Sequence, residues 1–185
     1  MREFLRRIAA LPEAAETIEA IGGGRAPVAL TGLAPVHRAT LAAALRQALG
    51  RPLTVICSDE SEAERMAADL AVLTGETPLK LYSRELYVPQ GAVTSREWEY
   101  RRIEALYRLD RGEGSVLVAT AEGLLQRTGE ASALRESAIP LSVGAQVDLT
   151  ALPERLVAAG YTRTEQVEGV GQFALRGGIL DVFSP

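Results

Sequence analysis

The sequence has few of the residues that most metal and nucleophilic sites need. Its 185 residues include a single cysteine, Cys57, and a single histidine, His37. One cysteine cannot form an internal disulfide, and this pair cannot build a Cys/His zinc site, which takes four ligands. No Ser/His/Asp set is visible either. We therefore predict neither a metal nor a cofactor, and we expect Cys57, which ends an apolar run, to be a small buried residue.

Long apolar runs and a strong basic charge are also missing. No stretch is apolar for long enough to span a bilayer, and the short apolar N-terminal segment, interrupted by Arg6 and Arg7, does not read as a signal peptide. Charged residues make up 24%, and the net charge is −4. These values predict a soluble, cytoplasmic globular protein without membrane contact. They also remove the simplest argument for nucleic-acid binding, which is a strongly basic surface.

A further absence is the lysine of a phosphate-binding loop. Residues 28–45 read VALTGLAPVHRATLAAAL, which predicts a short strand at Val28–Leu30, a turn at Thr31 and Gly32, and then a helix. A working loop reads G-x-x-x-x-G-K-[ST], because backbone N–H groups, lysine and hydroxyl together hold the phosphates and Mg²⁺. This stretch has the strand-to-turn layout without the lysine or the second glycine.

Two interpretations of this loop stay open. It is either an ordinary turn between strand and helix or a degenerate nucleotide site, in which His37 or Arg38 would meet a phosphate at the start of the helix. Pro35 removes one N–H donor from any cradle. No apolar strand ending in Asp-Glu follows, so hydrolysis would lack a magnesium ligand as well. We therefore predict that the chain is not an enzyme.

The first two thirds alternate strands with helices, which predicts an α/β fold with a parallel sheet flanked by helices on both faces. The expected strands are Leu53–Cys57, Leu79–Tyr82 and Val116–Ala119, and the expected helices include His37–Leu49 and Arg96–Leu109. Between them a helix from about residue 59 to residue 74 is expected, because Asp59 with Glu62, or Ser61 with Glu64, would form a capping box.

Near residue 130 the pattern changes to that of a small α+β domain, so we predict domains at 1–128 and 129–185. The expected parts are a connector at 128–137, strands at Ile139–Val143 and Tyr161–Val167, a helix capped by Thr150, and a strand at Gln172–Phe183. Within this last strand the apolar alternation slips across Gly177-Gly178. A β-bulge at the glycines would absorb the slip and aim Arg176 outward.

Four segments, in this order, carry a resemblance to a known family. They are the degenerate loop, TVICSDESEAERMAADL at 54–70, SVLVATAEGLLQR at 115–127, and the stretch 160–185, with GQFALRGGILDVF at 171–183 as its most specific part. Together they resemble the N-terminal module of the bacterial transcription-repair coupling factors (Mfd), which is itself similar to the excinuclease subunit UvrB. The resemblance covers essentially the whole chain, and the first 25 residues are the least distinctive.

Two departures from UvrB match the coupling-factor module. UvrB has an intact P-loop, and it carries an aromatic-rich β-hairpin that threads DNA. Residues 82–98 here are too short to hold such a hairpin. The resemblance implies a degenerate helicase-like domain, similar to UvrB domain 1a, followed by an incomplete small domain similar to UvrB domain 2.

The resemblance also implies a partner. In that family the small domain binds the damage-recognition ATPase UvrA, while RNA polymerase and DNA are engaged by parts that this chain lacks. Arg176 matches the arginine that contacts UvrA in the family, and an arginine can pair with a carboxylate through two N–H groups. Arg163 would extend the basic patch, and Gly177 lies next to Arg176 as a backbone device. We therefore expect a non-catalytic docking module.

Two alternatives stay open. The chain is a fragment of a UvrB- or helicase-type DNA-binding ATPase if nucleotide still binds at Thr31–Arg38. It is a DNA-binding module if the mixed aromatic and basic helix Trp98–Arg108 stacks on single strands, although Glu99 and Glu104 dilute the positive field.

Overall fold

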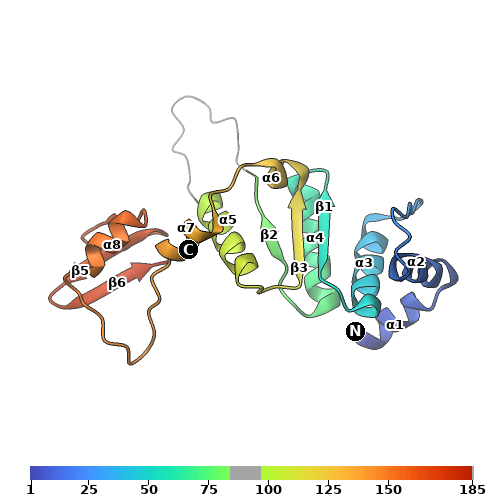
Figure 1. Cartoon of the computed structure of the whole chain (residues 1–185), viewed down its shortest axis with the longest axis horizontal. Helices are drawn as coiled ribbons and strands as arrows, with labels where there is room; N and C mark the ends of the chain where they lie inside the picture. The colour runs from blue at the N-terminus through green and yellow to red at the C-terminus, as the bar shows by residue number, and fades with distance from the viewer. Residues whose placement is uncertain (84–96, 185) are drawn as a thin grey trace. The chain divides into compact units, whose positions relative to one another are not determined.

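The computed structural model describes residues 1–83 and 97–184, which divide into two compact units (Figure 1). The described part of the first unit is residues 1–83 and 112–126, and that of the second is residues 97–111 and 127–184. The predicted boundary between residues 128 and 129 stays a prediction. So does the absence of a DNA-threading hairpin, because residues 84–96 lie outside the described part. Each unit is treated below by itself.

The first unit is built on a parallel sheet of three strands in the order β1-β3-β2. The strands are β1 (Leu53–Cys57), β2 (Leu79–Leu81) and β3 (Val116–Thr120), so three of the predicted strands are confirmed. The predicted strand at Val28–Leu30 is wrong. Val28 and Leu30 are 38% and 42% exposed and belong to no helix or strand. The three residues are apolar enough for a strand but pair with none of the strands described here.

The helices of the first unit form the core with one face of this sheet. They are α1 (Arg2–Ala9), α2 (Pro12–Gly22), α3 (Pro35–Leu49), α4 (Glu60–Thr74) and the short α6 (Ala121–Leu125). Val116 and Val118 pack with Met66 and Leu70 of α4 in one apolar cluster. Helix α3 contributes its buried alanines, such as Ala43, because small side chains let it lie close to α4. On the opposite face Ile56 of β1 is 60% exposed, so the predicted covering of both faces is not seen along β1.

Helix ends in this unit follow local chemistry, as the sequence predicted. Asp59 caps α4 by accepting a hydrogen bond from the backbone N–H of Glu62 at 2.8 Å. Thr120 caps α6 in the same way through the N–H of Gly123 at 3.1 Å. Gly50 ends α3 in the left-handed conformation, which glycine adopts without steric cost.

The second unit pairs three helices with a small mixed sheet (Figure 1). Its elements are α5 (Glu97–Asp110), α7 (Ala131–Ser137), α8 (Leu152–Ala158), β4 (Thr162–Arg163), β5 (Gln172–Arg176) and β6 (Ile179–Phe183). Strand β5 lies between a parallel neighbour, β4, and an antiparallel one, β6. Leu152 and Leu156 of α8 pack on Phe173, and all three are at most 2% exposed.

Several predictions for this unit are wrong. Residues 131–137 form helix α7 rather than a connector, and residues 139–143 form no strand, since Pro140 lacks an N–H and Val143 is fully exposed. The predicted cap at Thr150 is wrong, because the N-cap residue of α8 is Ala151 and makes no side-chain cap hydrogen bond. In the turn before the helix, the carboxylate of Asp148 accepts hydrogen bonds from the backbone N–H groups of Thr150 and Ala151. The strand expected at 161–167 is only the two residues of β4.

Helix α5 also faces differently from the prediction. Its sequence placed Ile103 with Leu106 and Tyr107 toward the core, but Ile103 is 46% exposed. Arg102, at 7% exposed, and Ala105, at 4%, face inward instead. The apolar spacing alone was ambiguous, because a long arginine stem can pack in place of an aliphatic side chain.

The two glycines at 177–178 form a tight turn, and the predicted β-bulge is wrong. Gly177 has φ 53° and Gly178 has φ 88°, and Arg176 pairs directly with Ile179. Two central residues with positive φ define a type I′ hairpin turn. The alternation of apolar residues shifts across the glycines because the chain reverses there, so that Phe173 lies opposite Val182.

Gly171, just before β5, allows close contact with α5. Its φ is 77°, and a Cβ built there would lie 2.2 Å from the Tyr100 hydroxyl oxygen. The ring of Tyr100 therefore occupies the space that any side chain at position 171 would need.

We expect Gly171→Ala to lower the free energy of unfolding by about 1–3 kcal/mol more than Gly178→Ala does. Both changes place alanine at positive φ, but a Cβ at Gly178 meets no atom within 4 Å. Urea unfolding measures the difference. In a Tyr100→Ala background the two alanine variants should become similar, and a persistent difference would contradict the contact.

Candidate docking site

The β5–β6 hairpin has a core face and an outer face. Phe173, Leu175, Leu180 and Val182 point toward α8, and successive side chains of a strand alternate between faces. The outer face therefore carries Gln172, Ala174, Arg176, Ile179, Asp181 and Phe183. Ala174 is 0% exposed, so the accessible part of this face is formed by Arg176, Ile179, Asp181 and Phe183. A surface for a partner, if the hairpin forms one, is this outer face.

Arg176 and Asp181 form an ion pair on the outer face. Nη2 of Arg176 donates a hydrogen bond to Oδ2 of Asp181 at 2.9 Å. Arg176 lies opposite Ile179 and Asp181 opposite Ala174, so the pair is a diagonal one across the two strands. The side chains are 64% and 45% exposed, which leaves both accessible to a partner.

Apolar side chains flank this pair. Ile179, beside the turn, is 66% exposed, and Phe183, at the far end of β6, is 48% exposed. An arginine between accessible apolar groups is a common composition for the centre of a protein interface. A phenylalanine in an apolar strand is expected in the core, and the exposure of Phe183 shows that this expectation is wrong here.

The other predicted docking residues lie elsewhere in the same sheet. Arg163 pairs in register with Phe173 on the parallel neighbour β4, so pleat alternation places it on the core face, at an edge strand and away from Arg176. Gly177 is the first turn residue. The structure brings Gly177 next to Arg176 and separates Arg163 from it.

Asp181 was missed in the sequence analysis. Its signal is present, because a Gly-Gly pair between alternating apolar residues is typical of a two-residue hairpin turn. Once the turn is recognised, residues 176 and 181 become diagonal neighbours.

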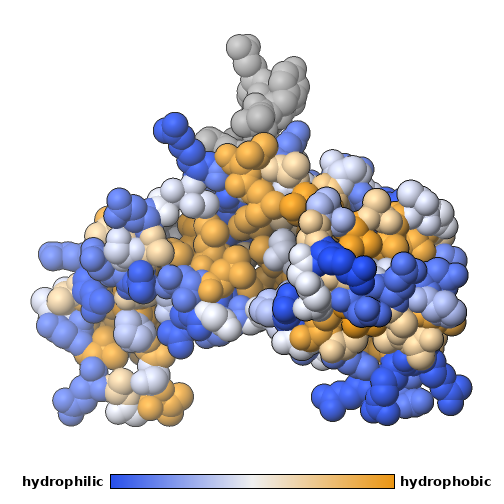
Figure 2. All heavy atoms as spheres, turned by 45° about the vertical axis from the view of Figure 1, so that its right-hand side comes forward, coloured by the Kyte–Doolittle hydropathy of each residue, from blue (hydrophilic) through white to orange (hydrophobic). Residues whose placement is uncertain are grey.

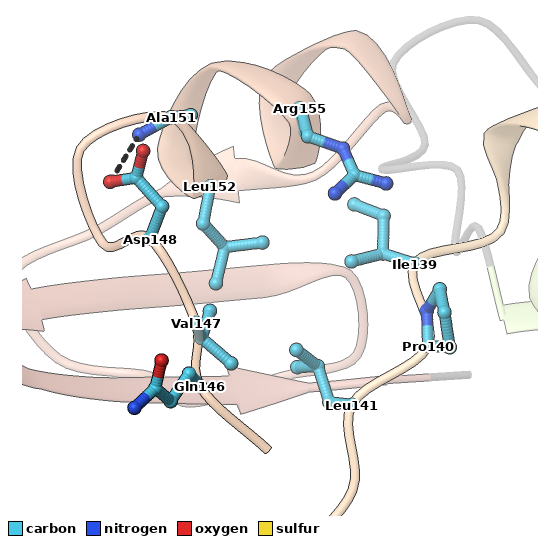
Figure 3. Close-up of a pocket in the computed structure, with 9 residues that line it drawn as sticks. All are labelled: Ile139, Pro140, Leu141, Gln146, Val147, Asp148, Ala151, Leu152 and Arg155. Carbon is cyan, nitrogen blue, oxygen red and sulfur yellow. Dashed lines mark hydrogen bonds between the residues drawn. The ribbon is translucent and has the colours of Figure 1, made fainter.

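A small pocket lies in the same unit, where the chain enters α8 (Figure 3). It has a volume of about 150 Å³ and an apolar lining that includes Ile139, Leu141 and Leu152. In Figure 3 the guanidinium of Arg155 lies near Ile139, and Asp148 is turned toward the backbone of Ala151. The lining includes one cation, Arg155, and one carboxylate, Asp148, which already accepts hydrogen bonds from the backbone of Thr150 and Ala151.

The loop at residues 31–38, which the sequence analysis compared with a phosphate-binding loop, lies in the first unit. Gly32 has φ 77°, Thr31 precedes it, and exposed His37 lies in the first turn of α3. Arg38 donates to the carbonyl of Leu33 at 3.2 Å and to the carboxylate of Glu62 at 3.0 Å. A phosphate at this turn would have to compete with Glu62 for the guanidinium.

A second acidic side chain lies where the three strands end. Oε1 of Glu60 accepts hydrogen bonds from the backbone N–H and the hydroxyl of Ser83, at 3.0 and 2.6 Å, and from the hydroxyl of Thr120 at 3.3 Å. Ligands of open parallel sheets bind at this carboxyl edge. Here a carboxylate of the chain itself binds the polar groups of that edge.

Other features give no sign of catalysis. Cys57 is 5% exposed, and burial, followed by the charge of Glu62, raises the pKa of its thiol. The thiol therefore stays protonated and unreactive, as expected of a small buried residue.

Over residues 1–83 and 97–184 no group of three acidic, histidine or cysteine side chains could hold a metal ion. In those same ranges no helix is long and apolar enough to cross a bilayer.

Apolar side chains also reach the surface of the first unit, as Figure 2 shows for one face. They include Val36, Ile56 and Val72, which are 54%, 60% and 70% exposed. The outer face is the candidate docking surface because it combines an exposed arginine, its paired carboxylate and two exposed apolar side chains.

Comparison with known proteins places the hairpin in a defined domain. The family model of the UvrB interaction domain matches residues 139–185, which include the pocket, α8 and the whole β5–β6 hairpin. The second part of the chain is therefore similar to UvrB interaction domains.

Most of the chain matches bacterial transcription-repair-coupling factors. It is 32% identical to that of Myxococcus xanthus over 179 residues, and 29% identical to that of Bacillus subtilis (strain 168) over 155 residues. These matches cover 92% and 83% of this chain, but only 15% and 13% of the relatives. The predicted resemblance to the coupling factors is confirmed, and it spans a small part of their length.

The loop geometry predicts that nucleotide does not bind. We expect ATP with Mg²⁺ to leave the melting temperature unchanged, because Arg38 is paired with Glu62 and the loop has no lysine. Thermal-shift titration measures this, with Mg²⁺ and NaCl as the ionic control. A saturable rise that Arg38→Ala removes would instead establish a nucleotide site.

The cap of α4 predicts an acid-sensitive first unit. Hydrogen bonds from the backbone and hydroxyl of Ser58 lower the pKa of Glu62 below its ordinary value of 4.5. A lowered pKa in the folded state means that the stabilisation is fully present above pH 4.5 and is lost as the pH falls below that value through the lower pKa of the folded state.

We therefore expect Glu62→Gln to unfold at lower urea concentration than wild type at pH 7, and to differ less from it at pH 3.5. Circular dichroism follows the unfolding. Glu16→Gln, which removes the same charge from an exposed site on α2, should show the wild-type pH dependence. An equal loss for Glu62→Gln at both pH values would contradict the assignment.

Proposed function

We propose that this chain is a non-catalytic docking module of a transcription-repair coupling factor, which recruits the excision-repair protein UvrA to stalled transcription complexes in the cytoplasm. The observation that carries the proposal is the position of the UvrB interaction domain. Its match covers residues 139–185, and these residues contain the exposed Arg176 on the outer face. Coupling-factor relatives match along most of the remaining chain.

The two units have different tasks in this proposal. The first is a helicase-like scaffold similar to UvrB domain 1a, in which Glu60 and Glu62 bind the groups that a nucleotide site would use. The second is similar to UvrB domain 2 and provides the partner surface. Contacts with RNA polymerase and DNA are proposed for other parts of a coupling factor and not for these residues.

Arg176 is the proposed centre of the UvrA contact. Arginine is enriched among residues that dominate binding, since its planar guanidinium makes two parallel hydrogen bonds to a carboxylate. Arg163, on edge strand β4, would extend the surface only around that edge, and Gly177 would act by shaping the turn.

We expect Arg176→Ala to weaken UvrA binding about tenfold and Arg176→Glu to weaken it further. Calorimetric titration of the 185-residue chain into UvrA measures this. The control is Arg155→Ala, which removes an exposed arginine from α8, on the core side of the sheet. Circular dichroism spectra must match.

Equal weakening by Arg176→Ala and Arg155→Ala would show a charge effect without a site, and normal binding by Arg176→Glu would reject the outer face. Arg163→Ala, measured in the same series, shows whether the surface reaches around β4. No binding by the wild-type chain would overturn the docking proposal for these residues.

A further inference from the structure

We infer that Asp181 is a positioning residue for Arg176, holding its guanidinium so that the free N–H groups face an acidic side chain of the docking partner. The inference rests on the proposed function, because it concerns the same outer face. It adds a second residue to the site and specifies the chemistry that the partner must offer.

The hydrogen bonding leaves Arg176 most of its capacity. A guanidinium has five N–H donors, and the contact with Asp181 uses a single Nη2–Oδ2 hydrogen bond of 2.9 Å. Along residues 1–83 and 97–184 the structure gives the other donors of Arg176 no partner. A carboxylate from another protein can therefore pair with the guanidinium while Asp181 stays bound.

The hairpin makes Asp181 a suitable support. It lies within strand β6, and its short side chain has little rotamer freedom to lose. The two-residue turn fixes the register that sets it diagonal to Arg176. Arg176, by contrast, is a long side chain that is 64% exposed and loses much rotamer freedom when a partner holds it. The hydrogen bond to Asp181 already restricts the Arg176 side chain in the free chain, so part of this loss of rotamer freedom has occurred before the partner binds.

An opposing effect is repulsion between Asp181 and an acidic partner. Both carboxylates would be exposed to water, where salt screens their interaction, and the guanidinium carries its positive charge between them. Because the repulsion is screened in this way, we expect the gain from ordering Arg176 to exceed it.

The pair also favours one class of partner. A carboxylate next to the guanidinium weakens the positive potential that attracts a polyanion, and the chain as a whole has a net charge of −4. Nucleic-acid phosphates gain from many positive charges at once, whereas a single acidic side chain needs one well-oriented arginine. The geometry thus fits an acidic group of a protein, flanked by apolar contacts for Ile179 and Phe183.

A double-mutant cycle with UvrA tests the inference. Because exposed ion pairs are weak, we expect Asp181→Ala to weaken binding about three- to fivefold when Arg176 is present. In the Arg176→Ala background the same change should have no effect. Asp181→Asn, which keeps an oxygen acceptor and the side-chain shape, should weaken binding less than Asp181→Ala.

A second readout follows Arg176 itself. ¹⁵N relaxation of its Nε–H group should show greater mobility in Asp181→Ala, with the amide spectrum of the core residues unchanged. A purely structural role of Asp181 would not change this side chain alone. If Asp181→Ala unfolds the hairpin, the double-mutant cycle of UvrA binding is measured with Asp181→Asn in its place.

The outcomes separate the two proposals. Suppose that wild type binds UvrA and that Arg176→Ala weakens this binding. If Asp181→Ala then leaves the binding equal or tighter, the positioning role alone is overturned. An equal effect of Asp181→Ala in both backgrounds also overturns it, because Asp181 would then act without Arg176. If wild type does not bind UvrA, both proposals fail. Increased DNA binding by Asp181→Ala in a mobility-shift assay would support the selection against polyanions.

Discussion

The type I′ turn at Gly177 and Gly178 is the constraint on which the second unit depends. Both residues have positive φ, and glycine adopts this conformation at little cost where residues with a Cβ are strained. The turn reverses the chain within two residues, and the reversal places Phe173 opposite Val182. Apolar side chains from both strands thereby reach α8, while Arg176 and Asp181 stay together on the other face. The packing of the core and the position of the candidate site therefore both depend on the backbone dihedral angles of Gly177 and Gly178.

In the first unit, acidic side chains of the chain itself bind the polar groups at the ends of the strands and at the start of α3. In a phosphate-binding fold, polar groups at the carboxyl edge of the sheet and at the helix start are kept for the ligand. Here Glu60 binds Ser83 and Thr120, and Glu62 binds Arg38. Satisfied polar groups lower the gain that a bound phosphate could bring. In the proposed function the first unit is a scaffold and not a nucleotide site.

Features decided within a few residues could be predicted from the sequence. The caps at Asp59 and Thr120 and the glycine that ends α3 depend on local hydrogen bonds and local φ, and the structure confirms them. The strand at Val28–Leu30 depends on a distant partner strand, which local composition does not reveal. The inward face of α5 depends on which neighbour accepts the stem of Arg102, and the spacing of apolar residues carries no such information.

The candidate site was predicted in part for the same reason. Arg176 stands out as a single charged residue within an apolar strand, so its exposure could be inferred. Asp181 could not, because a bulge and a hairpin turn explain the same slip in alternation, and only the turn brings residues 176 and 181 together. A bulge would also have placed residues 176 and 181 on one face, but within a single continuous strand, where they lie too far apart along the strand to pair. Choosing between the two needed the φ values of the glycines, which a sequence pattern does not contain.

A surface of this kind also fits the demands of recruitment. It has one arginine, one supporting carboxylate and two exposed apolar side chains, and few anchors carry most of the energy in such interfaces. A module that recruits a partner must later release it, which argues against a large apolar interface. Specificity then has to come from geometry more than from area. An arginine held in one orientation meets that need, because the fixed donors favour a carboxylate at one place and leave other groups unpaired.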